Sequence, residues 1–495
     1  MFQRSSGILM HISSLPSQYG IGDFGQEAYK FIDFLAEAKQ KLWQILPMGP
    51  TGYGDSPYQS FSAFAGNPYF IDLEDFVEKG LLEPGDLEEL KKYNVEGTIE
   101  YGMLYTLKLP VLRKAFEKFN ELKKTDEMES FKKKHNYWLV DYALFMALKG
   151  KFHQNNWQEW PTEYKFRDIK ALKKATLELK KEMDYFIFLQ YIFYLQWEKL
   201  KSYANIKGIK IIGDIPIFVS PDSADAWSKN EMFLFDENLK STKVAGCPPD
   251  AFSVDGQLWG NPLYDWKYMD ETGYKWWIER IKACFELHDI VRIDHFRGFE
   301  SYWAIPAESE TAATGAWEKG PGMKLFNAIN SALGKRPIIA EDLGFLTPEV
   351  EKLLKDSTYP GMKILLFAFD SKEENDYLPH KYPENSVAYT GTHDNMTVLG
   401  WYRGAEEEEK KICLEYLQNM GVTTYEINWK FIEAVWSTES KMVLTQTQDL
   451  LGLDNSGRMN TPSTSQGNWQ WRVKRGELDH RLAARLAELT QKNRR

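Results

Sequence analysis

The chain has 495 residues, of which 43% are hydrophobic, so it can bury a large core in one decorated barrel or in up to three domains. Its formal net charge of −10, with acids and bases interspersed, argues against nucleic acids and other polyanions as partners. Three widely spaced cysteines without a CxxC pair fit a reducing cytoplasm, and no apolar run is long enough to predict a membrane span.

Eight short apolar runs that end in polar residues recur along the chain, mostly separated by helical patterns. Strands that alternate with helices indicate parallel β/α units, and eight of them predict an α/β fold, the closed (β/α)8 TIM barrel. An open doubly wound sheet is the alternative, which the count disfavours without excluding. The runs are 7–12, 42–48, 209–219, 290–296, 337–341, 362–369, 386–393 and 442–450.

A glycine-rich stretch, Gly20-Ile-Gly-Asp-Phe-Gly25, follows the first run and precedes a predicted helix over 27–38, as in dinucleotide-binding proteins. However, the polar residues 13–19 separate the strand from the glycines, whereas the fingerprint requires a tight turn directly after the strand. The second run ends at Leu46-Pro-Met-Gly-Pro50, without an acid for a ribose. We therefore predict no nucleotide cofactor.

Two intervals are too long for simple crossovers between strands. We predict a single catalytic barrel over 1–495 that carries both of them as insertions. Residues 72–184, rich in Lys and Glu, predict a largely helical insertion between the second and third strands. Residues 220–273 predict a loop-rich insertion between the third and fourth strands.

The fourth run carries a cation and a carboxylate at alternate positions, Arg292 and Asp294. Side chains alternate between the two faces of a strand, so both point the same way. A nearby positive charge lowers the pKa of a carboxyl group, which suits an ionised nucleophile. A structural ion pair is the alternative, because such pairs perturb pKa values as active sites do.

Three further acids stand at the ends of other runs or inside one. Glu341 ends the fifth run, one strand over from Asp294, and Asp394 follows the seventh; either acid could instead cap the helix that follows it. Asp214 lies inside the apolar third run, where an unpaired carboxylate would be costly. The four acids together are explained poorly by structural roles alone.

Glycosyl transfer is the chemistry that these acids indicate, together with Arg292 and His393. One carboxylate acts as nucleophile and one carboxylic acid protonates the leaving oxygen, with about 5–5.5 Å between them when configuration is retained. Metal chemistry fits less well, because histidines are few, no HExxH occurs and Arg292 would oppose a cation. We predict no metal site.

These residues lie in stretches that closely resemble the amylomaltase family (4-α-glucanotransferase, disproportionating enzyme) of the α-amylase clan, and the resemblance spans essentially the whole chain. The matching stretches are Ser56-Pro-Tyr-Gln59, Ser62-Ala-Phe-Ala-Gly-Asn-Pro68, Gly213-Asp-Ile-Pro-Ile-Phe-Val219, Pro248-Pro-Asp250, Gly256-Gln-Leu-Trp-Gly-Asn-Pro262, Arg292-Ile-Asp-His-Phe-Arg-Gly298, Ala340-Glu-Asp-Leu-Gly344, Thr392-His-Asp-Asn395 and Gly467-Asn-Trp-Gln-Trp-Arg472.

The resemblance implies roles for individual residues. Asp294 would be the nucleophile and Glu341 the general acid/base, which should then have a raised pKa. Asp394 would bind the donor hydroxyls and distort the donor ring. The resemblance also implies a barrel with insertions, no nucleotide cofactor and no obligatory metal. The implied substrate-binding residues are Tyr58, Asp214, Phe252, Trp259, Asn261, Arg292, His393 and Asn460.

The implied function is retaining transfer of α-1,4-glucan segments to the 4-hydroxyl of an acceptor. Donors would be maltooligosaccharides, amylose, starch or glycogen, with glucose or maltose as acceptors, and no nucleic acid or membrane would take part. The alternatives are an α-1,4-glucan hydrolase and a non-catalytic glycan-binding barrel. The set of four acids argues against a binding barrel, which has no need of a catalytic pair. Whether the chain transfers or hydrolyses depends on how well water is excluded from the site, which the sequence shows only indirectly.

Two departures from the family pattern bear on the loops around this site. Ala251 stands where an aromatic residue is expected after Pro248-Pro-Asp250, and Ser463 stands where glycine commonly follows Asn-x-Pro. The loop with Ala251, Phe252 and Trp259 is predicted to roof the acceptor side and shut out water. Trp259 could instead anchor the loop by packing on the barrel.

Overall fold

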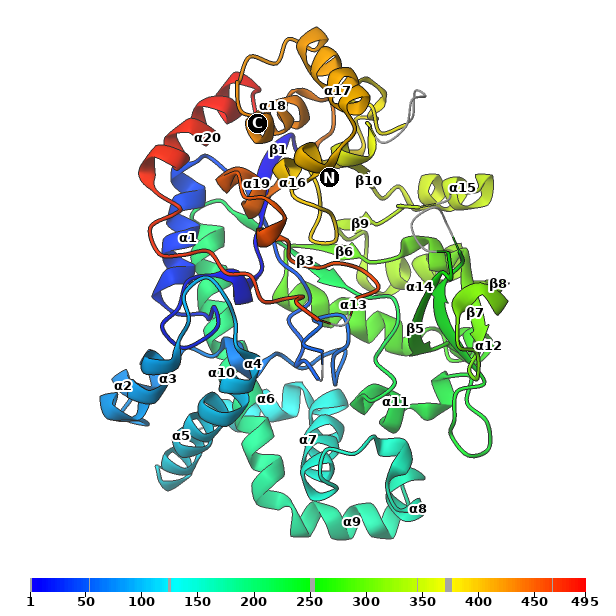
Figure 1. Cartoon of the computed structure of the whole chain (residues 1–495). Coiled ribbons are helices and arrows are strands. Elements are labelled where there is room, and N and C mark those ends of the chain that lie inside the picture. The colour runs from blue at the N-terminus through cyan, green and yellow to red at the C-terminus, as the bar shows by residue number, and fades with distance from the viewer. Residues whose placement is uncertain are drawn as a thin grey trace.

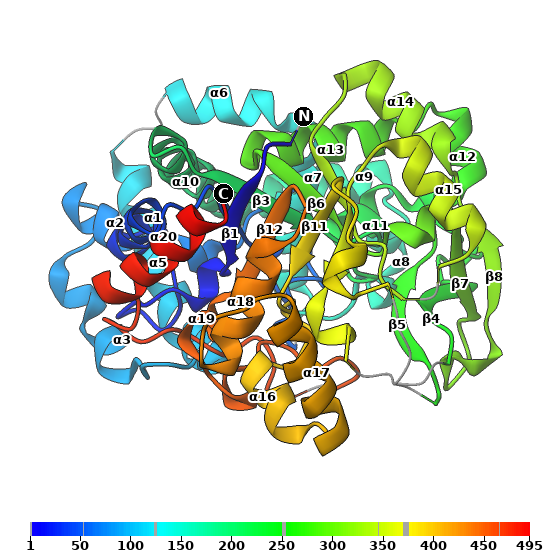
Figure 2. The same ribbon diagram turned by 90° about the horizontal axis from the view of Figure 1, so that it is seen from above.

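The computed structural model describes residues 2–52, 54–122, 126–249, 254–344, 346–369, 376–464 and 466–495. Its centre is an eight-stranded parallel sheet in the order β10-β11-β12-β1-β2-β3-β6-β9 (Figures 1 and 2). Each strand overlaps one of the eight predicted runs. The strands are β1 (Ser5–Leu9), β2 (Leu42–Gln44), β3 (Lys210–Ile215), β6 (Ile290–Ile293), β9 (Ile338–Ala340), β10 (Gly361–Ile364), β11 (Ser386–Tyr389) and β12 (Met442–Gln446).

The two outer strands of this order, β9 and β10, approach each other and close the barrel. The backbone N–H of Ala340, the last residue of β9, donates to the carbonyl of Pro360 just before β10 at 3.0 Å. Strands such as β6, β11 and β12 are buried along their full length, as expected where a sheet is covered on both faces. The predicted (β/α)8 barrel is therefore confirmed.

Helices between successive strands cover the outside of the barrel. Some begin where the sequence supplies a helix-start signal: α15 has Pro348 at its first position, and the carboxylate of Asp479 accepts from Leu482 N–H at the start of α20. In the described ranges no helix is long and apolar enough to cross a membrane. The covering helices are α1 (Gln26–Glu37), α10 (Lys180–Ile206), α13 (Lys275–Leu287), α14 (Met323–Leu333), α15 (Pro348–Ser357), α18 (Ile427–Ser437) and α20 (His480–Lys492).

The glycines of the stretch 20–25 have a packing role in the loop between β1 and α1. A Cβ atom on Gly22 would lie 1.9 Å from the carbonyl oxygen of Ile12. Gly25 precedes the first turn of α1, and its N–H donates to the carboxylate of Asp23 at 3.0 Å. Close backbone approach is thus a physical reason for glycine here.

The chain between β2 and β3 is mainly helical. The predicted boundary at residue 184 falls inside α10, which continues to Ile206 and packs against α7. The division of the chain into a barrel with an insertion over 72–184 stays a prediction. The helices before α10 are α2 (Glu74–Glu78), α3 (Glu88–Tyr93), α4 (Tyr101–Met103), α5 (Leu109–Glu121), α6 (Asp126–Lys134), α7 (Asn136–Lys151), α8 (Thr162–Lys165) and α9 (Ile169–Glu178).

A second, antiparallel sheet in the order β5-β4-β7-β8 flanks the barrel on the right of Figure 1. Strands β4 (Lys243–Cys247) and β5 (Gln257–Pro262) lie in the interval predicted to be loop-rich, together with α11 (Ala224–Ser228) and α12 (Trp266–Glu271). Strands β7 (Ser301–Pro306) and β8 (Ala316–Lys319) follow β6 and were not predicted. A register shift in β4 and a positive φ at Gly260 break the alternation that marks a strand in a sequence.

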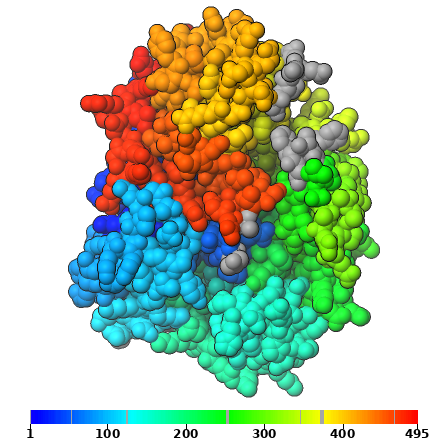
Figure 3. All heavy atoms as spheres, in the orientation of Figure 1, coloured from blue at the N-terminus to red at the C-terminus, as the bar shows by residue number. Residues whose placement is uncertain are grey.

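The C-terminal part of the chain returns to the N-terminal loops after α16 (Val398–Gly404), α17 (Glu407–Asn419) and α19 (Thr447–Leu451). The backbone N–H of Val473 donates to the carbonyl of Ser14 at 2.9 Å, and that of Ile99 donates to the carbonyl of Gln470 at 2.8 Å. In Figure 3 this orange and red part lies beside the blue and green parts on one face.

Candidate active site

The carboxyl ends of β3, β6 and β9 gather three acids around one arginine. Asp214 in β3 is paired in register with Arg292 in β6, and Glu341 directly follows β9. The guanidinium of Arg292 lies 3.2 Å from Asp294 Oδ1 and 2.9 Å from Glu341 Oε2, and it also pairs with Asp214. Although burial opposes its charge, these carboxylates raise the pKa of Arg292. Arg292 is thus a buried counterion to all three acids.

Asp294 and Glu341 hydrogen-bond each other. Burial, and then the charge of Glu341, raise the pKa of Asp294 well above its ordinary value, although Arg292 opposes this. Burial also acts to raise the pKa of Glu341, but Arg292, the bond to Asp294 and the His295 backbone N–H lower it to about 2. The pair therefore shares one proton, which resides on Asp294.

This proton distribution is the reverse of the one expected from the sequence, where Arg292 was to lower the pKa of Asp294 and leave Glu341 protonated. The physical reason is the position of the donors. Arg292 is nearer to Glu341 than to Asp294, and His295 N–H donates to Glu341 Oε2 at 2.7 Å. Two strong donors on one carboxylate favour its ionised form.

A second group of predicted residues connects to the first through Asp214. The hydroxyl of Tyr58 donates to Asp214 Oδ2 at 2.8 Å and lies 2.9 Å from His393 Nε2. The same His393 nitrogen is 3.3 Å from Asp394 Oδ2, and the Asn460 amide donates to Asp394 Oδ1 at 2.6 Å. The structure thus brings these predicted residues into one hydrogen-bonded cluster.

Two residues beside this cluster were not predicted. The ring of Trp469 lies 5.9 Å from that of Tyr58 and 6.0 Å from that of His393, measured between centroids. The guanidinium of Arg458 donates to the backbone carbonyl of Asp394 at 2.6 Å. Trp469 belongs to a stretch that matches the family, so the sequence held a signal for it. Arg458 lies outside all the matching stretches.

Trp259 lies near the carboxylate pair, because it packs on His295, the residue after Asp294. The rings of Trp259 and His295 are perpendicular, with centroids 4.9 Å apart. The indole N–H of Trp259 donates to Gln257 Oε1 at 3.0 Å, and the residue is only half-buried. Contact with the loop that holds Asp294 is compatible with both predicted roles, substrate contact and loop anchor.

Asn261 is placed differently from the other predicted residues. Its side-chain amide donates to the Val219 carbonyl at 2.8 Å and accepts from Gln59 at 3.2 Å, so it joins β5 to the loops after β2 and β3. Phe252 and Ala251 lie outside the described residues. Ser463 has φ of 65°, a left-handed conformation that costs a non-glycine residue about 1 kcal/mol, which explains why glycine suits this position.

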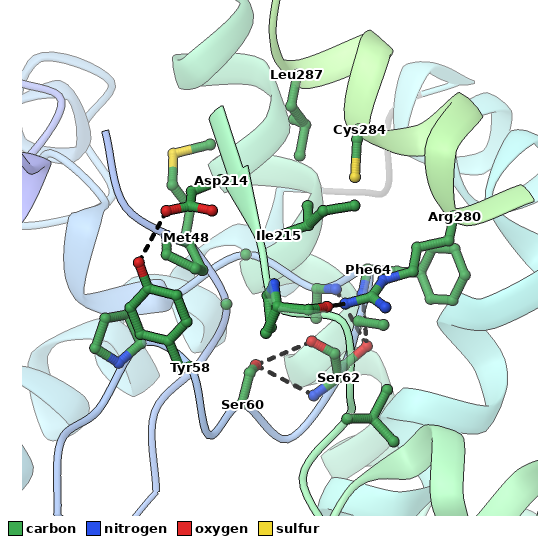
Figure 4. Close-up of a pocket in the computed structure, with 18 of the residues that line it drawn as sticks. Met48, Tyr58, Ser60, Ser62, Phe64, Asp214, Ile215, Arg280, Cys284 and Leu287 are labelled. Carbon is green, nitrogen blue, oxygen red and sulfur yellow. Dashed lines mark hydrogen bonds between the residues drawn. The ribbon is translucent and has the colours of Figure 1, made fainter. Parts of the chain in front are cut away.

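A cavity of about 70 Å³ lies behind β3, where its lining includes side chains of α10 and α13 such as Arg280. Figure 4 shows Tyr58 and Asp214 at the edge of this cavity, joined by their hydrogen bond. The Asp294–Glu341 pair does not line it. The cavity therefore borders the carboxylate cluster without containing its reactive pair.

A parallel barrel whose strand ends gather two interacting carboxyl groups is typical of enzymes that cleave or transfer glycosidic bonds. A family model described as 4-alpha-glucanotransferase matches residues 10–479. The chain belongs to this family, which confirms the resemblance found in the sequence and favours transfer over hydrolysis.

Individual relatives agree along the whole chain. A 4-alpha-glucanotransferase from Clostridium butyricum is 51% identical over 485 residues, covering 97% of this chain and 99% of that protein. One from Thermus thermophilus is 47% identical over 499 residues, covering 99% and 98%. The solved structure of amylomaltase from Streptococcus agalactiae in complex with acarbose matches with a TM-score of 0.96 and 42% identity, covering 100% of both chains.

Proposed function

We propose that this chain is a retaining 4-α-glucanotransferase that moves α-1,4-glucan segments to the 4-hydroxyl of an acceptor through a covalent glycosyl-enzyme. The observation that carries the proposal is the buried arrangement of Asp294 and Glu341 around Arg292 in a barrel of this family. The proposed donors are maltooligosaccharides, amylose, starch or glycogen, and the acceptors are glucan chains, maltose or glucose. The proposed compartment is a reducing cytoplasm.

In the first step, the carboxylate of Asp294 attacks the anomeric carbon while Glu341 gives its proton to the departing 4-oxygen. The two acids are hydrogen-bonded in this structure, closer than the roughly 5–5.5 Å of retaining enzymes. A donor ring that enters between them separates the pair. The shared proton must then lie on Glu341, because Asp294 reacts as the carboxylate and the departing oxygen takes its proton from Glu341.

In the second step, the carboxylate of Glu341 takes the proton of the acceptor 4-hydroxyl, whose oxygen attacks the anomeric carbon. The ester bond to Asp294 breaks, and Asp294 leaves as a carboxylate. Two displacements at one carbon retain its configuration. Arg292 stays paired with the carboxylates throughout, because the guanidinium remains charged at any working pH.

The donor sugar is held by the cluster around Asp394. Asp394 accepts hydrogen bonds from the donor hydroxyls, and Asn460 and His393 fix its orientation. Asp214 Oδ1 is buried and has no hydrogen-bond partner in the described part of the protein, so it is suited to accept from a further hydroxyl. Tyr58 orients Asp214 through its own hydroxyl.

Incubation with maltotriose tests the proposal directly. We expect a ladder of longer oligosaccharides together with free glucose, because each donor segment is passed to another glucan. Separation of the products by chromatography shows the ladder. Shortening alone, without any product longer than maltotriose, would assign the chain to the hydrolases instead.

Trp259→Ala is expected to raise the ratio of hydrolysis to transfer. The indole packs on His295 next to Asp294, so its loss admits water to the acceptor side and removes an apolar surface for the acceptor ring. The ratio is measured as free reducing ends against elongated products, and more acceptor should partly restore transfer. An unchanged ratio with a sharp fall in Tm would identify Trp259 as a loop anchor.

A further inference from the structure

The outer edge of the antiparallel sheet exposes an aromatic ring that the proposed reaction does not use. Trp317 in β8 is 41% exposed. The described ranges include every tryptophan of the chain, and none of the others is exposed. Exposed tryptophan is unusual, because this residue is highly buried on average. Leu258 in β5 and Val254 just before it are also exposed, so the same sheet carries further apolar surface.

The cross-strand register places these side chains on one face. Trp317 pairs with Trp303 in β7, Trp303 pairs with Gly246 in β4, and Gly246 pairs with Leu258 in β5. Directly opposite residues of antiparallel strands share a face. Between the two ends of this row, Gly246 has no side chain, and the indole of Trp303 donates to the carbonyl of Ala312 in a turn that packs on the same face. The exposed aromatic surface of the row is therefore the ring of Trp317 at the free edge.

The ring of Trp317 is held in a fixed orientation. The guanidinium carbon of Arg297 lies 3.8 Å from its centroid, and the ring of Trp303 packs edge-on at 5.1 Å. On the opposite face of β8, Glu318 accepts from the Tyr302 hydroxyl of β7 at 3.2 Å and forms an ion pair with Lys243 of β4. A flat ring that is fixed before binding loses little entropy when a ligand covers it.

This sheet is continuous with the proposed active site. Arg297 stands three residues after Asp294, and β5 also carries Trp259, which packs on His295. The proposed donors include polymers, which extend beyond the residues that contact the reacting sugar. Aromatic rings suit the apolar faces of glucose units, so the exposed ring of Trp317 beside a glycan-processing site matches such a chain.

We propose that Trp317 is the centre of a glucan-binding platform outside the reaction centre, on which an α-1,4-glucan chain of a polymeric substrate stacks. The proposal rests on the proposed function for the choice of ligand. It predicts that the platform raises the affinity for long glucans and leaves the affinity for short oligosaccharides unchanged, because only a long chain reaches both the platform and the reaction centre.

Trp317→Ala is the central variant, and Trp317→Phe is the matched variant that retains an aromatic ring. We expect KM for amylose to rise by about three- to tenfold in the alanine variant, the range that loss of one stacking contact gives. KM and kcat for maltotriose should stay at wild-type values. The phenylalanine variant should recover most of the amylose affinity, and Tyr425→Ala, at a 92% exposed ring, serves as the matched surface control.

Binding is also measured without turnover, by electrophoresis through gels that contain glycogen, with each variant in an Asp294→Asn background. Trp317→Ala should migrate faster than its parent in glycogen gels and equally in plain gels. Equal retardation of parent and variant would overturn the proposal, as would an equal loss of activity on amylose and maltotriose. Absence of maltotriose turnover in the wild type would instead reject the proposed function, while the gel result still decides on the platform.

Discussion

Asp294→Asn is expected to remove nearly all glucan transfer while the protein remains folded. The carboxamide cannot form the glycosyl ester, and loss of a nucleophile lowers kcat by several orders of magnitude, on the order of 10⁴ or more. The fold should survive because Arg292 keeps two buried counterions, Asp214 and Glu341. Glucose release from maltotriose measures kcat, and calorimetry measures Tm.

A surface acid provides the control for this substitution. Asp376, whose side chain is 85% exposed, undergoes the same change from carboxyl to carboxamide in Asp376→Asn and should keep full activity. Near-normal turnover by a pure, sequence-verified Asp294→Asn protein would end the assignment of Asp294 as nucleophile. A collapse of Tm would show instead that the Arg292 ion pair has a structural role.

Glu341→Gln is expected to show the second-largest effect, which depends on the donor. Natural glucans need a proton on the departing oxygen, so their kcat/KM should fall by about 10²–10⁴-fold. A donor with an activated leaving group, such as α-glucosyl fluoride, needs no such proton and should keep a faster first step. Azide, which attacks without a general base, should then rescue turnover as a glucosyl azide product.

The pH profile gives an independent test of Glu341. The hydrogen-bonded pair with Asp294 holds one proton, bound tightly because burial raises the pKa of Asp294. Wild-type kcat/KM on glucans should therefore fall as pH rises and the pair loses this proton. With the activated donor, Glu341→Gln should lose that alkaline fall. If both donors slow equally and azide has no effect, Glu341 is not the acid/base.

The barrel could be predicted from the sequence because its strands are short, apolar and end in polar residues. The antiparallel sheet could not, since β4 and β5 pair with a register shift and Gly260 in β5 has a positive φ. Strand β4 pairs with β7 across the intervening β5, α12, α13 and β6, a pairing that local sequence patterns do not reveal. The helical segment before β3 could be predicted in type but not in extent, because α10 continues without a break through residue 184.

The acids of the candidate site could be found from their positions at strand ends, and their partners came from family stretches. The proton distribution could not be found in this way. It depends on a difference of a few tenths of an ångström between the distances from Arg292 to Glu341 and to Asp294, and on the His295 backbone N–H. Such distances exist only after folding, since the residues lie on different strands.

The pairing of the first barrel strand with the last has a consequence for synthesis on the ribosome. Ser5 of β1 lies opposite Met442 of β12, and Asn460 supplies a hydrogen bond to Asp394. At about 5–20 residues per second, the nascent β1 waits roughly 20–90 seconds for its partner. During that time one edge of β1 has no native neighbour, so the barrel cannot close until β12 has been synthesised.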